Sequence, residues 1–261
     1  MALIIERYET VDSTMQVARA RAAAGAPSRT LVVAAAQTAG RGRRGRAWLS
    51  PSRAGIWLTA IWRPPAPLDG PPLAFLALVA GVAALRAARR LGADAAMLKW
   101  PNDVVVGEGK LCGVLLEGDD IGGREPLVFA GLGLNVRRRA DLDVRAVRDE
   151  DALGHYVGLD EVAPGAAPQD YEAVLAATAA ELDRAYVEWL AKGCGPALRE
   201  WRQADALLGE HVRAESATGS VQGEACGISD SGALCVRGPG GVVEVTTGEV
   251  VRVRSAVLSR L

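Results

Sequence analysis

The sequence predicts an α+β protein in which a domain of strands and helices is followed by a small β-barrel. Through the first 208 residues, apolar and alternating runs typical of strands are interspersed with long alanine-rich runs typical of helices. From Glu210 onward, short alternating segments are broken by glycines at regular intervals. We therefore expect two domains, 1–208 and 209–261, with the boundary near Gly209.

The composition is that of a globular protein and argues against several classes. Of the 261 residues, 49% are hydrophobic and 23% are charged, and the formal net charge is −1. A net charge near zero argues against general binding of DNA or RNA. No uncharged apolar run reaches the roughly 18–20 residues that a transmembrane helix needs, and the N-terminus lacks the features of a secretory signal. We expect a cytoplasmic protein with no membrane partner.

The expected elements of the first domain follow from local signals. Capping residues precede the first helix and Gly25 follows it, while Pro101 ends one strand and a Gly-Glu-Gly turn at 107–109 joins two others. The charged stretch 137–151 is expected to be a loop. Strands are expected over residues 3–7, 31–36, 55–62, 96–100, 103–106, 111–117 and 127–136, and helices over 15–24, 73–91, 170–191 and 196–208.

A glycine- and arginine-rich loop follows the second expected strand. Residues 40–46, GRGRRGR, contain four arginines and three glycines. Glycine lets the backbone take up positive φ and approach a ligand closely, and arginine offers a planar fork of donors to phosphate and carboxylate oxygens. The loop predicts a ligand with several acidic oxygens, although a solvated basic loop or a nucleic-acid contact gives the same local pattern.

The distribution of lysine indicates two further candidates. The chain has 27 arginines and only three lysines, and two of the three, Lys99 and Lys110, fall within twelve residues of each other. A compact ammonium cannot be replaced by a planar guanidinium where the geometry is tight. Lys99 and Lys110 are therefore candidates for roles that arginine cannot fill.

Two other features are ambiguous when taken alone. Gly131 and Gly133 lie on an expected strand, where glycine marks either a β-bulge or a ligand lying against the backbone. The run Asp12, Ser13 and Thr14 precedes the first helix, where such side chains either cap the helix or present hydroxyls and free amides to a ligand.

Three motifs occur in an order and at spacings that resemble the biotin–protein ligase family: QTAGRGRRGRAW at 37–48, KWPNDVVVGEGKLCGVLLE at 99–117 and GLGLNV at 131–136. The resemblance implies a mixed, largely antiparallel sheet flanked by helices, the class II synthetase-like fold of lipoyl and biotinyl ligases, followed by a small SH3-like barrel. It also implies a two-step reaction. Biotin is activated by ATP, as its Mg²⁺ complex, to biotinyl-5′-AMP, and the biotinyl group is then transferred to a lysine of the biotin carboxyl carrier domain of acyl-CoA carboxylases.

The same resemblance assigns residues to the two substrates. Lys110 and Arg43 are implied as catalytic cations, and Asp103 as a residue that holds Mg²⁺ or orients the attacking amine, with no resident metal site. Met15 stands where the family often has asparagine, which implies a backbone contact there. The implied biotin-binding residues are Ser13, Thr14, Met15, Gln37, Arg41, Gly42, Arg43, Lys110, Gly113, Gly131 and Gly133, and the implied ATP-binding residues are Arg46, Trp48, Lys99, Asn102, Asp103 and Asn135.

Several alternatives remain open at this point. Lipoate–protein ligases and octanoyltransferases share the superfamily, and Cys112 is the only candidate for the cysteine nucleophile of an octanoyltransferase, although we expect it to be a packed residue. A nucleic-acid-binding module built on the basic loop is the alternative from a different class. Only eleven residues precede Asp12, so we expect no DNA-binding domain and no DNA partner, and either a monomer or a homodimer.

Overall fold

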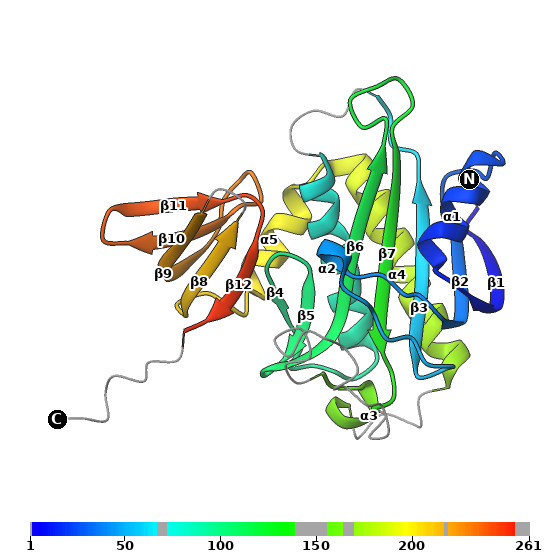
Figure 1. Cartoon of the computed structure of the whole chain (residues 1–261), viewed down its shortest axis with the longest axis horizontal. Coiled ribbons are helices and arrows are strands. Elements are labelled where there is room, and N and C mark those ends of the chain that lie inside the picture. Colours follow the sequence, from blue (N-terminus) through cyan, green and yellow to red (C-terminus); the bar gives the residue numbers. More distant parts are fainter. Residues whose placement is uncertain (1, 67–71, 139–155, 164–169, 217–218, 254–261) are drawn as a thin grey trace.

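The computed structural model describes residues 2–66, 72–138, 156–163, 170–216 and 219–253, and its strands form two separate sheets (Figure 1). The first sheet has seven strands in the order β1-β2-β3-β7-β6-β5-β4, and the second has five in the order β11-β10-β9-β8-β12. The strands of the first sheet are β1 (Ile4–Val11), β2 (Thr30–Gln37), β3 (Gly55–Trp62), β4 (Met97–Lys99), β5 (Asp103–Val106), β6 (Gly109–Asp119) and β7 (Leu127–Asn135). Those of the second are β8 (His211–Ser216), β9 (Gly219–Ile228), β10 (Leu234–Gly238), β11 (Gly241–Val245) and β12 (Glu249–Arg252).

The seven-stranded sheet is mixed and largely antiparallel, which confirms the expected fold class. Only the β1–β2 pair is parallel among the described strands, and the five other pairs run antiparallel. Each strand that the sequence predicted is present, and β3 has the predicted bounds. The expected loop at 137–151 lies mostly outside the described residues.

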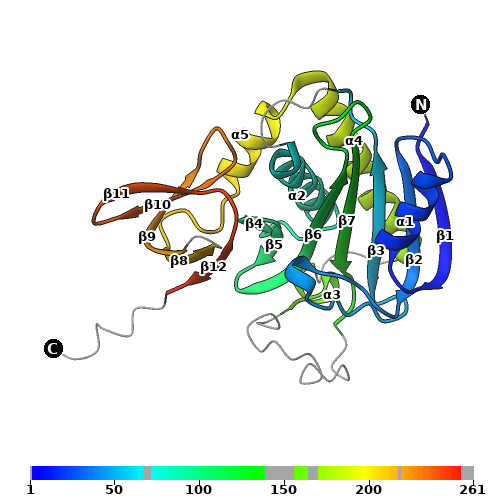
Figure 2. The same cartoon turned by 45° about the horizontal axis from the view of Figure 1, so that its top comes forward.

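Helices cover both faces of this sheet. One face carries α1 (Thr14–Ala23), and the other carries α2 (Pro72–Arg90) and α4 (Tyr171–Lys192), which lie side by side behind the sheet in Figures 1 and 2. The remaining described helices are α3 (Leu159–Val162), α5 (Gly195–Gln203) and the single 3₁₀ turn η1 (Arg43–Gly45).

The last expected helix was predicted too long. The sequence favoured a helix to residue 208, whereas α5 ends at Gln203. The next residues pair with the edge of the large sheet instead: the amide of Leu98 donates to the carbonyl of Ala204 at 2.7 Å, and the amide of Ala206 donates to the carbonyl of Leu98 at 2.8 Å. These tertiary hydrogen bonds replace the continuing helical ones.

Alternating side chains on the central strands divide the core in two. On β3, Ile61 packs with Met15 toward α1, whereas its neighbour Trp62 faces α2 and α4. Trp62 stacks on Tyr186 of α4 with ring centroids 4.6 Å apart. Trp57 and Trp62 are both buried, which confirms the interpretation of these residues as core.

The five-stranded sheet lies beside the β4–β5 end of the large sheet (Figure 2). All its described pairs are antiparallel, as expected for a small β-barrel. The indole Nε1 of Trp100 donates to the carbonyl of Gly232 at 3.1 Å and ties the two parts together. The division at 208/209 stays a prediction and falls between α5 and β8. Across the described residues, no helix is both long and apolar enough to cross a membrane.

Candidate active site

A cavity of about 690 Å³ lies between the large sheet, the glycine–arginine loop and the edge of the small sheet. Every residue that the motifs predicted for the site lines this cavity except Asn135. The lining residues are Ser13, Thr14, Met15, Gln37, Arg41, Gly42, Arg43, Arg46, Ala47, Trp48, Leu58, Thr59, Lys99, Trp100, Pro101, Asn102, Asp103, Val105, Gly107, Glu108, Lys110, Gly113, Val114, Leu115, Gly131, Leu132, Gly133, Arg213, Glu249, Val250, Val251 and Arg252.

The register of the sheet explains why distant motifs meet. Directly paired residues on neighbouring antiparallel strands point to the same face, and one such row crosses the sheet on the cavity side. It runs through Lys99, Asp103, Gly113, Gly133 and Trp57. Residues from five strands, with numbers from 57 to 133, therefore share one line on this face of the sheet.

One end of the cavity is neutral and rich in hydrogen-bonding groups. The amide and hydroxyl of Thr14 both donate to Gln37 Oε1, at 2.8 and 3.0 Å. Gln37 Nε2 in turn donates to Ser50 Oγ at 2.7 Å, and the hydroxyls of Thr14 and Thr59 lie 2.9 Å apart. This network fixes the orientation of each group, so this end suits a neutral polar ring that needs directional hydrogen bonds.

Ser13 occupies the N-cap position of α1 but its side chain does not cap the helix. The side-chain capping interpretation is therefore wrong for this residue. Ser13 and Thr14 are both buried at the neutral end of the cavity. The amide of Thr14, the first residue of α1, is satisfied there by Gln37 Oε1.

Glycines make room for two large side chains on the cavity floor. The pairing of β7 with β3 and β6 is continuous through Gly131 and Gly133, so the β-bulge interpretation is wrong. A Cβ atom at Gly133 would lie 2.5 Å from Nε1 of Trp48, and one at Gly131 would lie 3.1 Å from Cε of Met15. Any larger residue at Gly133 would displace the indole of Trp48 from the floor.

Lys110 stands at the middle of the cavity. Its Nζ lies 2.7 Å from Asp103 Oδ1 and 5.1 Å from the ring centroid of Trp48. Asn135 lies behind this residue instead of lining the cavity: its Nδ2 donates to the backbone carbonyl of Lys110 at 3.1 Å. Asn135 therefore holds the strand that carries Lys110, and its implied role in binding ATP stays a prediction.

The other end of the cavity is cationic and poorly solvated. Burial lowers the pKa of the Lys99 ammonium, although the nearby Asp103 carboxylate acts in the opposite sense. Burial also lowers the pKa of the Arg43 guanidinium, against the effects of Asp103 and Glu249. Arg43 donates to Asn102 Oδ1 and to the carbonyl of Gly248, each at 3.1 Å. Cations held in this way gain strongly when an anion replaces the lost water.

The glycine–arginine loop closes over the cavity as a tight turn. The amide of Gly42 donates to the carbonyl of Arg46 at 2.7 Å, and Arg44 and Gly45 have φ of 55° and 74°. Glycine at position 40 lets the start of the loop pass close to the backbone of Trp48, since a Cβ at Gly40 would lie 2.3 Å from the carbonyl oxygen of Trp48. The loop thus has a defined course across the opening.

Residues 8–135 match the Biotin/lipoate A/B protein ligase family, and residues 207–253 match the Biotin protein ligase C terminal domain. The Biotin--[acetyl-CoA-carboxylase] ligase of Mycobacterium tuberculosis is 35% identical over 246 residues, which are 90% of this chain and 84% of that protein. The chain belongs to the biotin–protein ligase family. The bifunctional ligase/repressor BirA of Bacillus subtilis is 30% identical over 93% of this chain and 72% of its own length.

Solved structures of biotin protein ligases have the same fold. The Aquifex aeolicus biotin protein ligase in complex with biotin and ATP superposes with a TM-score of 0.80 at 25% identity, over 96% of this chain and 99% of that one. The Leishmania major biotin protein ligase in complex with biotinyl-5-AMP gives a TM-score of 0.62 at 26% identity, over 95% and 100% of the two chains.

The small sheet also lines the cavity, and the sequence motifs did not predict this contribution. Glu249 of β12 accepts a hydrogen bond from Arg46, and Arg252 donates to the carbonyl of Ala206 at 2.6 Å. An isolated charged residue on an alternating strand gives no sequence signal of this role, because such residues commonly face solvent. The missed lining residues of this sheet are Arg213, Glu249, Val250, Val251 and Arg252.

Two further findings limit the chemistry of the site. Cys112 is fully buried, and burial raises the pKa of its thiol, so it is a poor nucleophile. This argues against the octanoyltransferase alternative, which needs a reactive cysteine. Among the residues that the structure describes, no group of three or more His, Cys, Asp and Glu side chains is arranged to hold a metal ion.

Proposed function

We propose that this protein activates biotin with Mg-ATP to biotinyl-5′-AMP and transfers the biotinyl group to a lysine of a biotin carboxyl carrier domain. One observation carries the proposal: a single cavity joins a neutral, hydrogen-bonding end to a cationic end, and Lys110 stands at the junction. Such a cavity suits a molecule with a neutral polar ring and an acidic tail next to a polyphosphate. The relatives with ligase names support the same activity.

In the first step the biotin carboxylate oxygen attacks the α-phosphorus of ATP, and the bond to the β-phosphate breaks to release pyrophosphate. The bicyclic ring lies at Ser13, Thr14 and Gln37, so the carboxylate points toward Lys110. The Lys110 ammonium stabilises both the carboxylate and the negative charge that grows on the α-phosphate. Lys99 and Arg46 hold the outer phosphates, which arrive with Mg²⁺ as part of the substrate.

In the second step the ε-amine of the carrier lysine attacks the biotinyl carbonyl, and AMP leaves as the amide forms. The adenylate is a mixed anhydride that water hydrolyses, so the enzyme needs to cover it until the carrier arrives. Arg41, Gly42 and Arg43 supply this cover. Asp103, which lies 2.7 Å from the Lys110 ammonium, keeps that cation in position and orients the incoming amine.

The partner that fits this reaction is the carrier domain of an acyl-CoA carboxylase, modified in the cytoplasm. Lipoate is the nearest rival substrate because one matched family covers both biotin and lipoate ligases. The two acids differ at the ring: the ureido group of biotin needs donors and acceptors of the kind that Thr14 and Gln37 present, whereas a dithiolane ring does not.

The proposal is tested by ATP–pyrophosphate exchange on the purified chain with biotin and, in parallel, with lipoate. We expect exchange with biotin alone. Exchange with lipoate alone would overturn the substrate and keep the adenylation chemistry. An absence of exchange with either acid would contradict the proposed function.

A further inference from the structure

Glu117 lies on the cavity side of the sheet, one row beyond the neutral end. The paired rows on this face run from Gly113–Gly133 through Leu115–Gly131 to Glu117–Phe129. Side chains on one strand alternate between faces, so Glu117 points to the same side as Gly113 and Leu115. Glu117 is the last residue of the 99–117 motif, and the resemblance gave it no role. It is not part of the cavity lining, but it lies beside Arg41, which is.

The Glu117 carboxylate is shared between two guanidinium groups. Its Oε2 accepts from Nη2 of Arg19 at 2.9 Å, and its Oε1 lies 3.3 Å from Nη2 of Arg41. Arg19 belongs to α1, whereas Arg41 opens the glycine–arginine loop and lines the cavity. Glu117 therefore connects the loop to the scaffold through one carboxylate.

The scaffold side of this connection is firmly held. The Arg19 guanidinium lies over the ring of Phe129, 4.6 Å from its centroid, and also bonds Asp119. Arg19 lies one helical turn after Met15, which lines the cavity. Because Arg19 has three partners, it orients Glu117 so that one oxygen faces the loop.

The other side of the loop is held by different groups. Arg43 bonds Asn102 and the carbonyl of Gly248, and Arg46 bonds Glu249. These contacts lie at the cationic end of the cavity. The contact of Arg41 with Glu117, in contrast, holds the loop at the biotin end and not at the cationic end.

We propose that Glu117 is a positioning residue that latches Arg41, and with it the start of the loop, over the biotin end of the cavity. This inference rests on the proposed function. Neutral glutamine at 117 keeps the size of the side chain and removes the charge that attracts Arg41. The loop then opens at the biotin end, biotin leaves faster, and ATP is still held by the contacts at the other end.

The test compares Glu117→Gln with Asp119→Asn in the exchange assay, with separate titrations of biotin and ATP. Asp119 also pairs with Arg19 but does not touch the loop, so it is a matched control. We expect the KM for biotin to rise roughly three- to fivefold in Glu117→Gln, as for a partly exposed ion pair, with the KM for ATP unchanged. Asp119→Asn should behave as wild type.

Two further measurements separate a latch from a general structural effect. In the Arg41→Met background, Glu117→Gln should add nothing further to the KM for biotin, because the two variants remove the same contact. Trypsin should cut the loop arginines faster in Glu117→Gln than in Asp119→Asn when biotin and ATP are bound. If Glu117→Gln lowers the melting temperature, Arg41→Met still removes the contact without disturbing Arg19.

The outcomes distinguish the two proposals. If wild type shows no biotin-dependent exchange, the proposed function and the latch both fail. If wild type is active but Glu117→Gln matches Asp119→Asn in KM for biotin and in cleavage, the latch alone is wrong. Additive effects with Arg41→Met, or an equal rise in the KM for ATP, would also overturn it.

Discussion

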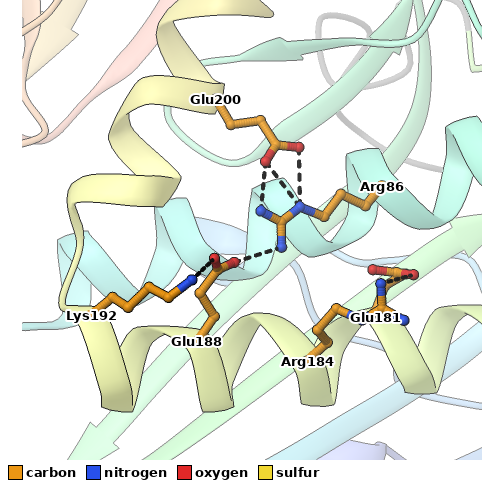
Figure 3. A network of polar contacts seen from close by, with 6 residues as sticks. All are labelled: Arg86, Glu181, Arg184, Glu188, Lys192 and Glu200. Atoms are coloured by element: carbon orange, nitrogen blue, oxygen red, sulfur yellow. Dashed lines mark hydrogen bonds and ion pairs between the residues drawn. The ribbon is translucent and has the colours of Figure 1, made fainter.

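Charged side chains are arranged in opposite ways in the helix layer and in the cavity. In the helix layer, Arg86 of α2 pairs with Glu188 at 3.0 Å and with Glu200 at 2.6 Å, and Lys192 pairs with Glu188 at 3.3 Å (Figure 3). Arg184 completes this helix network with Glu181. Arg90 also pairs with Glu181 at 3.3 Å, so in this layer each of four cations has a carboxylate partner among Glu181, Glu188 and Glu200. Among the described residues that line the cavity, seven cations face three carboxylates: Arg41, Arg43, Arg46, Lys99, Lys110, Arg213 and Arg252 against Asp103, Glu108 and Glu249.

The pKa shifts in the two regions have opposite signs. Hydrogen bonds to Glu200 raise the pKa of Arg86, so its charged form is already satisfied within the fold. Burial lowers the pKa of Lys99 and of Arg43, so their charged forms are under-solvated until a ligand arrives. The cations of the helix network are therefore paired within the fold, whereas the cavity holds cations that an anionic ligand completes.

The largest expected effect comes from the cation at the centre of the cavity. Replacing Lys110 by methionine removes the charge that stabilises the reacting carboxylate and α-phosphate, so biotin-dependent exchange should fall by about a hundredfold or more. Lys192→Met is the matched control, because that lysine is exposed in the helix network, and it should leave exchange unchanged. Melting temperatures of both variants check the fold, since Lys110→Met also leaves Asp103 without its partner.

If Lys110→Met and Lys192→Met are equally active, the cavity cation has no special role and the contrast between the two regions is wrong. A loss of exchange in both, with normal melting temperatures, would show that the helix network also takes part in the reaction.

An intermediate effect is expected from pH, through Lys99. Its pKa lies below the usual 10.5 because of burial, and only the protonated ammonium attracts phosphate. As pH rises through this lowered pKa, the protonated fraction of the free enzyme falls, so the KM for ATP should rise at a lower pH than for an ordinary lysine. A bound phosphate favours the charged form and raises this pKa again.

Lys99→Arg isolates this effect because a guanidinium stays charged across the whole range. The variant should start from a higher KM for ATP at neutral pH, owing to its different shape, and lose the alkaline rise. Lys110 also carries an ammonium, so the diagnostic quantity is the difference between the KM–pH profiles of wild type and Lys99→Arg. If the KM for ATP rises with pH in the same way in wild type and in Lys99→Arg, Lys99 is excluded as the phosphate contact.

Local signals in the sequence predicted the elements well, and they failed where tertiary hydrogen bonds decide. β3 has the predicted bounds because alternation and tryptophans define it locally. The predicted helix extended beyond the end of α5 because the pattern of residues 204–208 is compatible with a helix. The hydrogen bonds of Ala204 and Ala206 to Leu98, which end the helix, belong to the tertiary structure. The four-residue α3 has no periodicity long enough to detect.

The candidate site shows the same limit. Motifs identified the residues that line the large-sheet side of the cavity, since unusual glycine and arginine runs stand out in a sequence. Glu249 and Arg252 lie outside the motifs, and Glu117 ends one motif without an assigned role. The contacts of these three residues depend on strand order and on how the small sheet docks. Neither property can be read from local spacing.

The smallest expected effect on activity comes from the helix network, where stability changes instead. Arg86→Met leaves the carboxylates of Glu188 and Glu200, both 25% exposed, without their main partner, and should lower the free energy of unfolding by about 1–3 kcal/mol, between the values for exposed and buried pairs. Arg7→Met breaks a pair that is more than half exposed on both sides, so it should cost less than about 1 kcal/mol. Urea unfolding measures both changes. At a temperature where both variants are folded, the KM values for biotin and ATP should equal those of wild type, because neither Arg86 nor Arg7 lines the cavity and salt and water screen charges at this distance. A change in either KM in Arg86→Met but not in Arg7→Met would mean that the helix network helps to shape the site.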